Sequence, residues 1–427
     1  MNFQMILGVV VIIATVYFLA KRYESRLVLF AAGFVMSCIA LNPMAAMDGF
    51  SKAMKNYKLI EPIVASMAFA YVMKLTKCDS HLVHFLSNKI SRFGYFIIPG
   101  ALLITAFINI SITSSSGCSA AVGAIIIPLL MKMGVHPAIA GSTVLLGTYG
   151  SPMINPGYHQ VVIAAEVAQK VPMDFVNFVF GPTFVNAIIC AVVLTVTAVV
   201  LKEHKGYVPE GEIETPDMDF KVDHLKAVIP IVPVALLLLA NGGYLPGMKK
   251  LAISHAMIFG SVLAFIVTHK EISPADITKQ FFKGMGEAFG HVYGIITCSL
   301  IFVAGMNALG LIKALIAMMI ANPGIAKIAG TAGPFVLAVI CGSGDAAAVS
   351  FNTAVTVHAA SFGLDPLHLG SATALAACLG RTMSPLAGSC LICAGYANVN
   401  PLEISKRNAI PTALCAAVFT IYSLYIL

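Results

Sequence analysis

An uncharged stretch of 36 residues, Phe96 to Met131, narrows the possible folds of this chain more than any other feature. Apolar stretches of similar character recur along all 427 residues, which are 59% hydrophobic and 11% charged. Because a soluble domain carries roughly 25% charged residues, the composition indicates an integral membrane protein surrounded by the lipid bilayer. The formal charge of +7 is explained by loops beside the membrane, without a nucleic-acid partner.

The length of this stretch excludes two simple arrangements. As one helix it would be about 54 Å long, whereas the hydrocarbon core is roughly 30 Å thick. Two full spans would leave each arm about 15 residues, or roughly 22 Å, once the polar middle "SITSSSG" is set aside. A re-entrant helical hairpin fits both limits. Its tip should line a cavity, because irregular backbone at membrane depth must be surrounded by protein or water.

The second half of the chain repeats this pattern. A second polar-tipped stretch, "VLAVICGSGDAAAVSFNTAV", covers residues 336–355, and each tip is followed by a Gly-x-x-Pro turn. At an offset of 229 positions, Ser114, Gly134, Pro137, Gly141 and Ser142 recur as Ser343, Gly363, Pro366, Gly370 and Ser371. Each half then has a span broken by Pro and Gly, "YGSPMINPG" at 149–157 and "GRTMSPLAG" at 380–388. Paired, interrupted segments of this kind indicate the binding site of a transporter.

Further apolar stretches complete an all-α polytopic membrane protein. They predict spans at about residues 3–20, 27–41, 60–76, 176–201, 226–241, 251–268, 289–308 and 409–427. Between 74 and 93, the residues Leu82, Phe85, Leu86 and Ile90 recur at helical spacing among charges, which predicts an amphipathic surface helix. The polar stretch from 202 onward reads as a cytoplasmic linker.

These features divide the chain into two repeats. The first covers residues 1–201, with scaffold helices in 1–92 and transport elements in 93–201. The linker covers 202–224. The second repeat covers 225–427, with scaffold helices in 225–327 and transport elements in 328–427.

The distribution of basic residues predicts the orientation. With the N-terminus outside, inside loops hold 17 Lys and Arg and outside loops 8, while Arg381 is left within the membrane. Lys52, Lys55 and Lys58 in an outside loop are the contrary signal. In this topology the two halves run in opposite directions, which is the inverted repeat of a secondary transporter.

At these residues a family resemblance emerges. The segments "GSGDAAAVSFNTAVTVHAASFGLDP" and "RTMSPLAGS" resemble the anaerobic C4-dicarboxylate carrier (DcuC-type) family of the ion transporter superfamily. The resemblance implies a homodimer in the bacterial inner membrane that carries dicarboxylates such as succinate and fumarate by an elevator motion. Sodium-coupled relatives place a Ser-Asn-Thr triplet at each hairpin tip. This sequence has only "FNT" at 351–353, past the second tip.

The hairpin tips fit an anionic substrate, because helix N-termini present unpaired N–H groups and a positive dipole end. The residues expected to bind substrate are Thr113, Ser114, Ser115, Ser116, Gly117, Ser151, Asn155, Ser343, Gly344, Arg381 and Ser384. Those expected to couple an ion are Asp345, Asn109, Asn352 and Thr353. The coupling ion would be H⁺ or Na⁺, and no other cofactor is expected. The serines could instead satisfy the broken backbone, and Arg381 could pair with Asp345.

Other function classes stay open at this point. A carrier of another organic anion, or an ion antiporter of the same superfamily, would use the same duplicated tips. An intramembrane hydrolase would also place serine, histidine or aspartate in a wet cavity. However, the sequence lacks GxSxG and a second aspartate at membrane depth. A channel would not need a closed site between two broken repeats.

Overall fold

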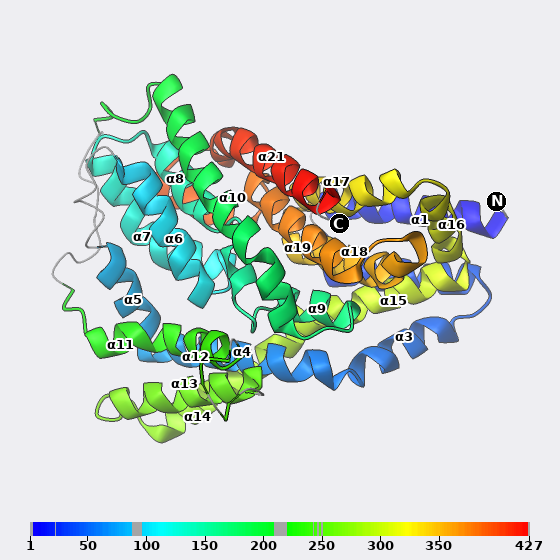
Figure 1. Cartoon of the computed structure of the whole chain (residues 1–427), viewed down its shortest axis with the longest axis horizontal. Coiled ribbons are helices and arrows are strands. Elements are labelled where there is room, and N and C mark those ends of the chain that lie inside the picture. Colours follow the sequence, from blue (N-terminus) through cyan, green and yellow to red (C-terminus); the bar gives the residue numbers. More distant parts are fainter. Residues whose placement is uncertain are drawn as a thin grey trace.

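The computed structural model describes residues 3–21, 23–87, 96–208, 220–241, 243–245, 247–248 and 251–425. Within these ranges every regular element is a helix (Figure 1). Most of the linker, the predicted surface-helix residue Ile90 and its neighbours lie outside the described residues.

The first half contains ten α-helices and one short 3₁₀ helix within the described residues. They are α1 (Phe3–Ala20), α2 (Ser25–Ile39), α3 (Met44–Met54), α4 (Tyr57–Thr76), α5 (Cys78–Ser87), α6 (Ile97–Ser111), α7 (Ser115–Lys132), α8 (Pro137–Gly147), η2 (Ser151–Ile154), α9 (His159–Val167) and α10 (Pro172–Val200). The predicted amphipathic helix corresponds to α5, whose Leu82 is buried and which packs against α11, α6 and α7.

The second half follows with α11 to α21. The elements are α11 (His224–Val228), η3 (Ile229–Ile231), α12 (Val232–Asn241), α13 (Ile253–Thr268), α14 (Pro274–Glu287), η4 (Ala288–Tyr293), α15 (Gly294–Ala308), α16 (Leu311–Ala321), α17 (Pro323–Cys341), α18 (Gly344–Ala354), η5 (Thr356–Phe362), α19 (Pro366–Met383), α20 (Gly388–Ala397) and α21 (Pro401–Tyr425).

Helix starts recur along the chain at one spacing. The first residues of α1, α7, α8, α9 and α10 are 3, 115, 137, 159 and 172, and 229 positions later α12, α18, α19, α20 and α21 begin at 232, 344, 366, 388 and 401. Four of these five pairs lie in residues 93–201 and 328–427, where they comprise the returning arms of the hairpins and the three helices that follow each of them. The order of elements therefore repeats most strictly in the part of the chain expected to carry function.

Several helices are apolar and long enough to cross a membrane. Five such segments occur in the described residues: Tyr57–Thr76, Ser115–Lys132, Pro172–Val200, Pro274–Ala308 and Pro366–Ala397. The segment Pro274–Ala308 is longer than the span expected at 289–308. The second arm of the first hairpin, α7, has 18 residues rather than the expected 15 or so, whereas α6 has 15 and would be about 22 Å long, too short to cross.

Helices of the two halves pack against one another rather than forming separate bundles. The largest core joins residues of α6–α10 with residues of α19–α21. Elsewhere α2 packs along α15. Helix α4 packs against α13 and α14 (Figure 1). The α2–α15 contact is very close, since a Cβ built on Gly305 would lie 2.4 Å from the Gly33 carbonyl oxygen.

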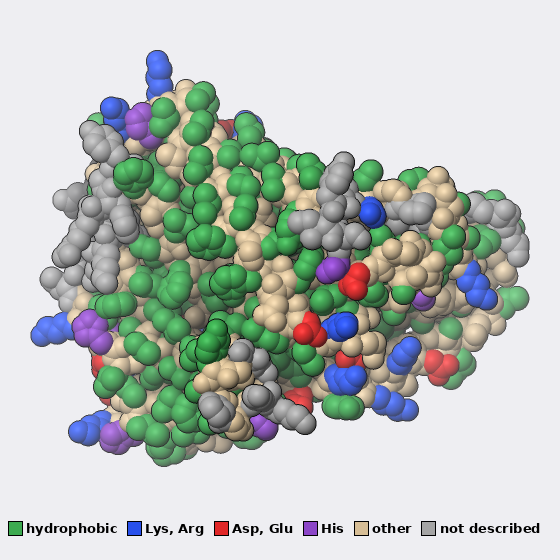
Figure 2. All heavy atoms as spheres, in the orientation of Figure 1, with side chains coloured by type: hydrophobic (Ala, Val, Ile, Leu, Met, Phe, Trp, Pro, Cys, Tyr) green, Lys and Arg blue, Asp and Glu red, His purple; other side chains and the backbone are tan. Residues whose placement is uncertain are grey.

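The surface agrees with a bilayer environment. Figure 2 shows hydrophobic side chains spread over much of the visible face, while charged side chains of both signs gather to the right of its middle and toward the lower right. Large apolar side chains such as Phe180, Phe184 and Val192 of α10 are more than half exposed. In water such a surface would associate, whereas hydrocarbon solvates it at no cost.

Candidate functional site

Hydrogen bonds from polar residues of the first hairpin stabilise its turn between α6 and α7. Asn109 is fully buried, and its Nδ2 donates to the Ile112 carbonyl over 2.8 Å. Ser114 caps α7, because its hydroxyl accepts the Gly117 N–H at 3.2 Å. Ser114, Ser116 and Gly117 are exposed, whereas Thr113 and Ser115 are half-buried. The tip thus combines a structural turn with a row of accessible small polar residues.

The second hairpin is built in the same way between α17 and α18. Gly342 has a φ of 72°, and a Cβ on it would lie 2.8 Å from the Leu386 carbonyl carbon, so the turn requires glycine there. Ser343 caps α18 by accepting the Ala346 N–H at 3.1 Å. Since Ser343 lies 229 positions after Ser114, the two hairpins start their returning arms with the same cap.

Each break is fastened to its own hairpin by one polar side chain. Asn155 donates to the Ile110 carbonyl at 2.9 Å and accepts the Gly157 N–H at 2.9 Å. Ser384 donates to the Val339 carbonyl at 2.7 Å and accepts the Leu386 N–H at 3.2 Å.

The side chain, the carbonyl and the N–H of this bridge lie at residues 155, 110 and 157 in the first half and at 384, 339 and 386 in the second. Each pair is 229 positions apart, so the same bridge occurs twice. Ser151 adds a further link in the first half only, by donating to the Asn109 Oδ1 at 3.0 Å.

The hairpins also contact the broken helix of the opposite half. The Asp345 carboxylate lies in the first turn of α18. Its Oδ1 accepts a hydrogen bond from the Gln160 Nε2 at 2.6 Å and lies 2.8 Å from the His159 Nε2. Its side chain is 43% exposed. At the corresponding positions of the other pair of elements, a Cβ built on Gly388 would lie 3.3 Å from the Ser116 Oγ.

Arg381 joins the two breaks. Its Nη1 donates to the Ser389 Oγ at 2.9 Å, and its Nη2 donates to the Thr148 carbonyl at the end of α8. Asp345 is bound by His159 and Gln160, so the alternative of an Arg381–Asp345 ion pair is not what the structure shows. Both Nη atoms also donate to the Thr148 Oγ1 at 3.5 Å, so the Nε–H is the guanidinium donor without a hydrogen bond to the described residues.

Four helix starts converge on this region. α7 and α20 meet through Ser116 and Gly388, and α9 and α18 meet through His159 and Asp345. Ala387 also lies beside the second tip, because its N is 2.9 Å from a Cβ built on Gly342. Each helix N-terminus carries roughly half a positive charge and unpaired N–H groups. Helix N-termini and a guanidinium are groups that attract anions.

Two of the residues expected to couple an ion lie away from the second tip. Thr353 donates to the Val349 carbonyl within its own helix. Asn352 is buried, accepts the Thr356 hydroxyl at 2.8 Å and donates to the Gly370 carbonyl at 3.4 Å. Both are two turns along α18 from Asp345. The structure therefore does not bring them together with the tip.

Four residues of this region are absent from the binding residues expected from the sequence: Thr148, His159, Gln160 and Ser389. All four lie at the ends of the helices that flank the breaks. The offset of 229 aligns His159 with Gly388 and Gln160 with Ser389, in the first turns of the two helices that follow the breaks. No cluster of three or more His, Cys, Asp or Glu side chains suited to a metal ion occurs in the described part of the chain.

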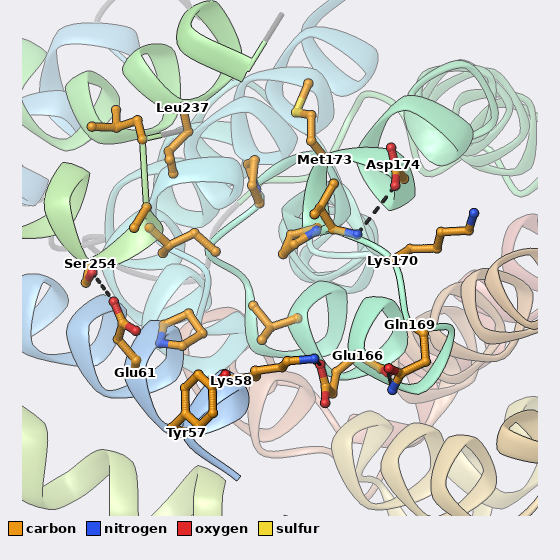
Figure 3. A pocket seen from close by; sticks show the side chains of 18 of the residues that line it. Tyr57, Lys58, Glu61, Glu166, Gln169, Lys170, Met173, Asp174, Leu237 and Ser254 are labelled. Atoms are coloured by element: carbon orange, nitrogen blue, oxygen red, sulfur yellow. Dashed lines mark hydrogen bonds and ion pairs between the residues drawn. The ribbon is translucent and has the colours of Figure 1, made fainter. Parts of the chain in front are cut away.

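A cavity of about 930 Å³ opens at the other end of α9 (Figure 3). Glu61 of α4 accepts a hydrogen bond from Ser254 of α13 at 2.5 Å, and Lys58 lies 3.6 Å from Glu166 of α9. The cavity reaches Pro156 in the first break. It therefore extends from the surface between α4 and α10 to the first break.

Known proteins resemble this chain over most of its length. An uncharacterized transporter of Haemophilus influenzae is 36% identical over 62% of this chain and 98% of its own. The anaerobic C4-dicarboxylate transporter DcuC of Escherichia coli K12 is 23% identical over 96% of this chain and 93% of its own. The crystal structure of the Alcanivorax borkumensis YdaH transporter superposes with a TM-score of 0.58 at 13% identity, covering 88% of this chain and 87% of that one.

The superposition on the YdaH structure shows a shared fold. The sequence comparisons also show the family to which the chain belongs. The family model for the C4-dicarboxylate anaerobic carrier matches residues 68–427, which include both hairpins and both breaks. The resemblance seen in the sequence is confirmed: the chain belongs to the C4-dicarboxylate anaerobic carrier family, DcuC.

Proposed function

We propose that this chain is a secondary active transporter of C4-dicarboxylates such as succinate and fumarate, and that it binds the dianion where the two hairpin tips meet the two breaks. The observation that carries the proposal is the convergence of four helix N-termini around Arg381. The family and the names of the relatives support this substrate class. Members of this family are carriers and not enzymes, and the apolar helices make the chain a multi-pass membrane protein.

The charge of the site favours a dianion. Four half-charges from helix ends and one guanidinium exceed the single negative charge of Asp345. Positive charges held close together in low-dielectric surroundings repel one another strongly, so the site without a ligand is destabilised. A doubly charged ligand neutralises this positive charge better than a monocarboxylate does. The small side chains at Ser114, Ser115, Ser116, Gly117 and Gly344 let the ligand approach the backbone N–H groups.

The proposed mechanism is an elevator with alternating access. The transport elements, 93–201 and 328–427, would move as one body, and their shared core of α6–α10 with α19–α21 supports this division. The scaffold would contain the close α2–α15 contact and would form a homodimer. The two halves would be inverted repeats, with the N-terminus outside the bacterial inner membrane. Coupling would use protons or sodium, or the carrier would run as an exchanger.

Uptake into proteoliposomes tests the substrate class. The purified protein should take up succinate and fumarate with saturation and counterflow, in preference to monocarboxylates and tricarboxylates of a matched panel. Runs with and without sodium and pH gradients identify the driving ion. Saturable uptake of a different organic anion, with no response to C4-dicarboxylates, would redirect the proposal to another substrate of this superfamily. Flux without saturation or counterflow would indicate a channel.

A further inference from the structure

The contact between the second hairpin and α9 contains ionisable side chains that substrate binding alone does not require. We propose that the His159–Asp345 pair is a proton-binding site of the carrier, in which the His159 imidazole takes the proton while Asp345 and Gln160 orient the ring. The inference rests on the proposed transport function and adds the coupling ion and the residue that carries it.

The hydrogen bonds assign the roles of the three side chains. Gln160 donates from Nε2 to the Asp345 Oδ1 at 2.6 Å, while its Oε1 accepts the Cys378 thiol at 3.5 Å, which fixes the amide orientation. The same Oδ1 lies 2.8 Å from the His159 Nε2. An oxygen that already accepts from an amide is best satisfied if His159 also donates to it, so Nε2 carries a hydrogen. A further proton then binds at Nδ1 and converts the pair to imidazolium and carboxylate.

This geometry favours a proton over sodium. Hard cations take oxygen ligands, whereas the Asp345 Oδ1 is enclosed by two nitrogen donors that a metal ion would have to displace. Imidazole is the side chain that ordinarily titrates near neutral pH. The His159 side chain is 17% exposed and that of Asp345 is 43% exposed, so water can deliver a proton to the pair.

The groups around the pair are few within the described residues. Arg381 and Cys378 face it from α19, Tyr158 precedes His159, and Cys341 ends α17 beside Ser343. Lys58 and Glu166 pair at the other end of α9. Arg381 is the permanent charge among the near neighbours, so the net charge of this corner depends on whether His159 is protonated.

The repeat sets this contact apart from its counterpart. Residues 159 and 345 correspond to 388 and 116, where a glycine meets a serine and nothing can ionise. The contact between hairpin and opposite helix is thus present twice, but only one copy holds a proton site.

The proton site adjoins the proposed substrate site. A Cβ built on Gly344 would lie 3.5 Å from the Arg381 Cβ. Asp345 follows Gly344 in the sequence, so it lies close to α19, the helix that carries Arg381. Protonating His159 adds a positive charge beside a dianion, which favours binding of both. Linkage then requires that the dianion raise the proton affinity of the site by the same factor.

Proteoliposomes that contain a pH-sensitive dye test the inference with fumarate, whose carboxyl groups stay ionised between about pH 6 and 7.5. In the wild-type protein, an inward proton gradient should drive fumarate accumulation, and fumarate entry should acidify the lumen. His159→Gln keeps a donor for Asp345 but cannot take a proton. It should still exchange fumarate at equal pH, at a lower rate because the charge that favours the dianion is gone, and it should lose both the gradient response and the acidification. Asp345→Asn, whose neutral amide does not stabilise an imidazolium, should lose both as well. His358→Gln, on the short helix η5, is the matched control and should behave as wild type.

The outcomes separate the inference from the transport proposal. If the wild-type protein exchanges no C4-dicarboxylate, the transport proposal fails. If it exchanges fumarate but responds to sodium and not to protons, or if His159→Gln acidifies the lumen as the wild type does, the proton site is refuted. Should His159→Gln not insert, the wild-type comparison of sodium with proton gradients and the Asp345→Asn variant still decide the question.

Discussion

At the residue scale, the polar side chains of the breaks have a structural role that their position alone did not reveal. Asn155 and Ser384 were predicted to bind substrate, and the structure places each within hydrogen-bond distance of a hairpin carbonyl and of the next backbone N–H. Their exposed fractions are 3% and 0%. Each one therefore joins a hairpin to a break, which positions the helix ends that would meet a ligand.

Replacing either bridge by alanine should cost both stability and transport. Asn155→Ala and Ser384→Ala each remove the side-chain partner of a hairpin carbonyl and of a backbone N–H in partly buried surroundings, and such a loss costs about 1 to 3 kcal/mol. We expect a lower Tm in detergent and a transport rate reduced at least about tenfold for each variant.

Ser350→Ala, which removes only a 3.5 Å contact with Ser299, is the control. Wild-type Tm and rate in Asn155→Ala would show that the bridge does not position the hairpin.

At the element scale, most of the helices expected as spans, and both helix–turn–helix hairpins, could be predicted from the sequence. Uncharged stretches of defined length set the spans, and Ser, Gly and Pro mark the caps and breaks, so these features depend on local residues. Helices α3, α14 and α16 were not predicted, since they are short or mix apolar and polar residues. The contact between His159 and Asp345 joins residues 186 positions apart, and no local pattern reports such a pairing.

The start of α21 provides an element whose stability should depend on pH. Hydrogen bonds from Lys406 and Arg407 lower the pKa of Glu403 to about 2, from an ordinary value of 4.5. Arg407 also binds Glu203, which follows α10, so this turn ties two long helices together.

Because the pKa of Glu403 is lowered by folding, its stabilising effect is complete above pH 4.5 and is lost as the pH falls from 4.5 toward 2. The Tm of the purified protein should therefore fall more steeply over this range in the wild type than in Glu403→Gln. Thermal unfolding in detergent at a series of pH values measures both. Parallel curves for the two proteins would show that Glu403 does not contribute.

At the scale of the whole molecule, the repeat was visible in a handful of matched residues, and the structure extends it to helix starts and to paired hydrogen bonds. The sequence could not show that each hairpin contacts the broken helix of the opposite half, because the offset relates equivalent positions and does not report which of them touch. The direction of each half relative to the membrane likewise depends on loop charge, and it stays a prediction.

Labelling of the linker tests the orientation. Gly211→Cys, at a position outside the described residues, should react with an impermeant maleimide from the cytoplasmic side and not from outside intact cells. The experiment requires a background in which Cys38, the one exposed cysteine of the described residues, is replaced. Labelling from outside would reverse the assigned topology and the charge count behind it.

Calorimetry of succinate binding to wild type and to Arg381→Gln tests most directly whether Arg381 and the converging helix ends bind a dianion. Losing one partner of a desolvated charge pair costs on the order of 2 to 5 kcal/mol, so Kd should rise at least about 30-fold. The preference for succinate over butyrate should shrink. Ser115→Ala should change Kd by less than about threefold, since a backbone N–H contact survives loss of the hydroxyl. If Arg381→Gln folds, inserts and binds succinate as the wild type does, Arg381 is not the ligand-binding group.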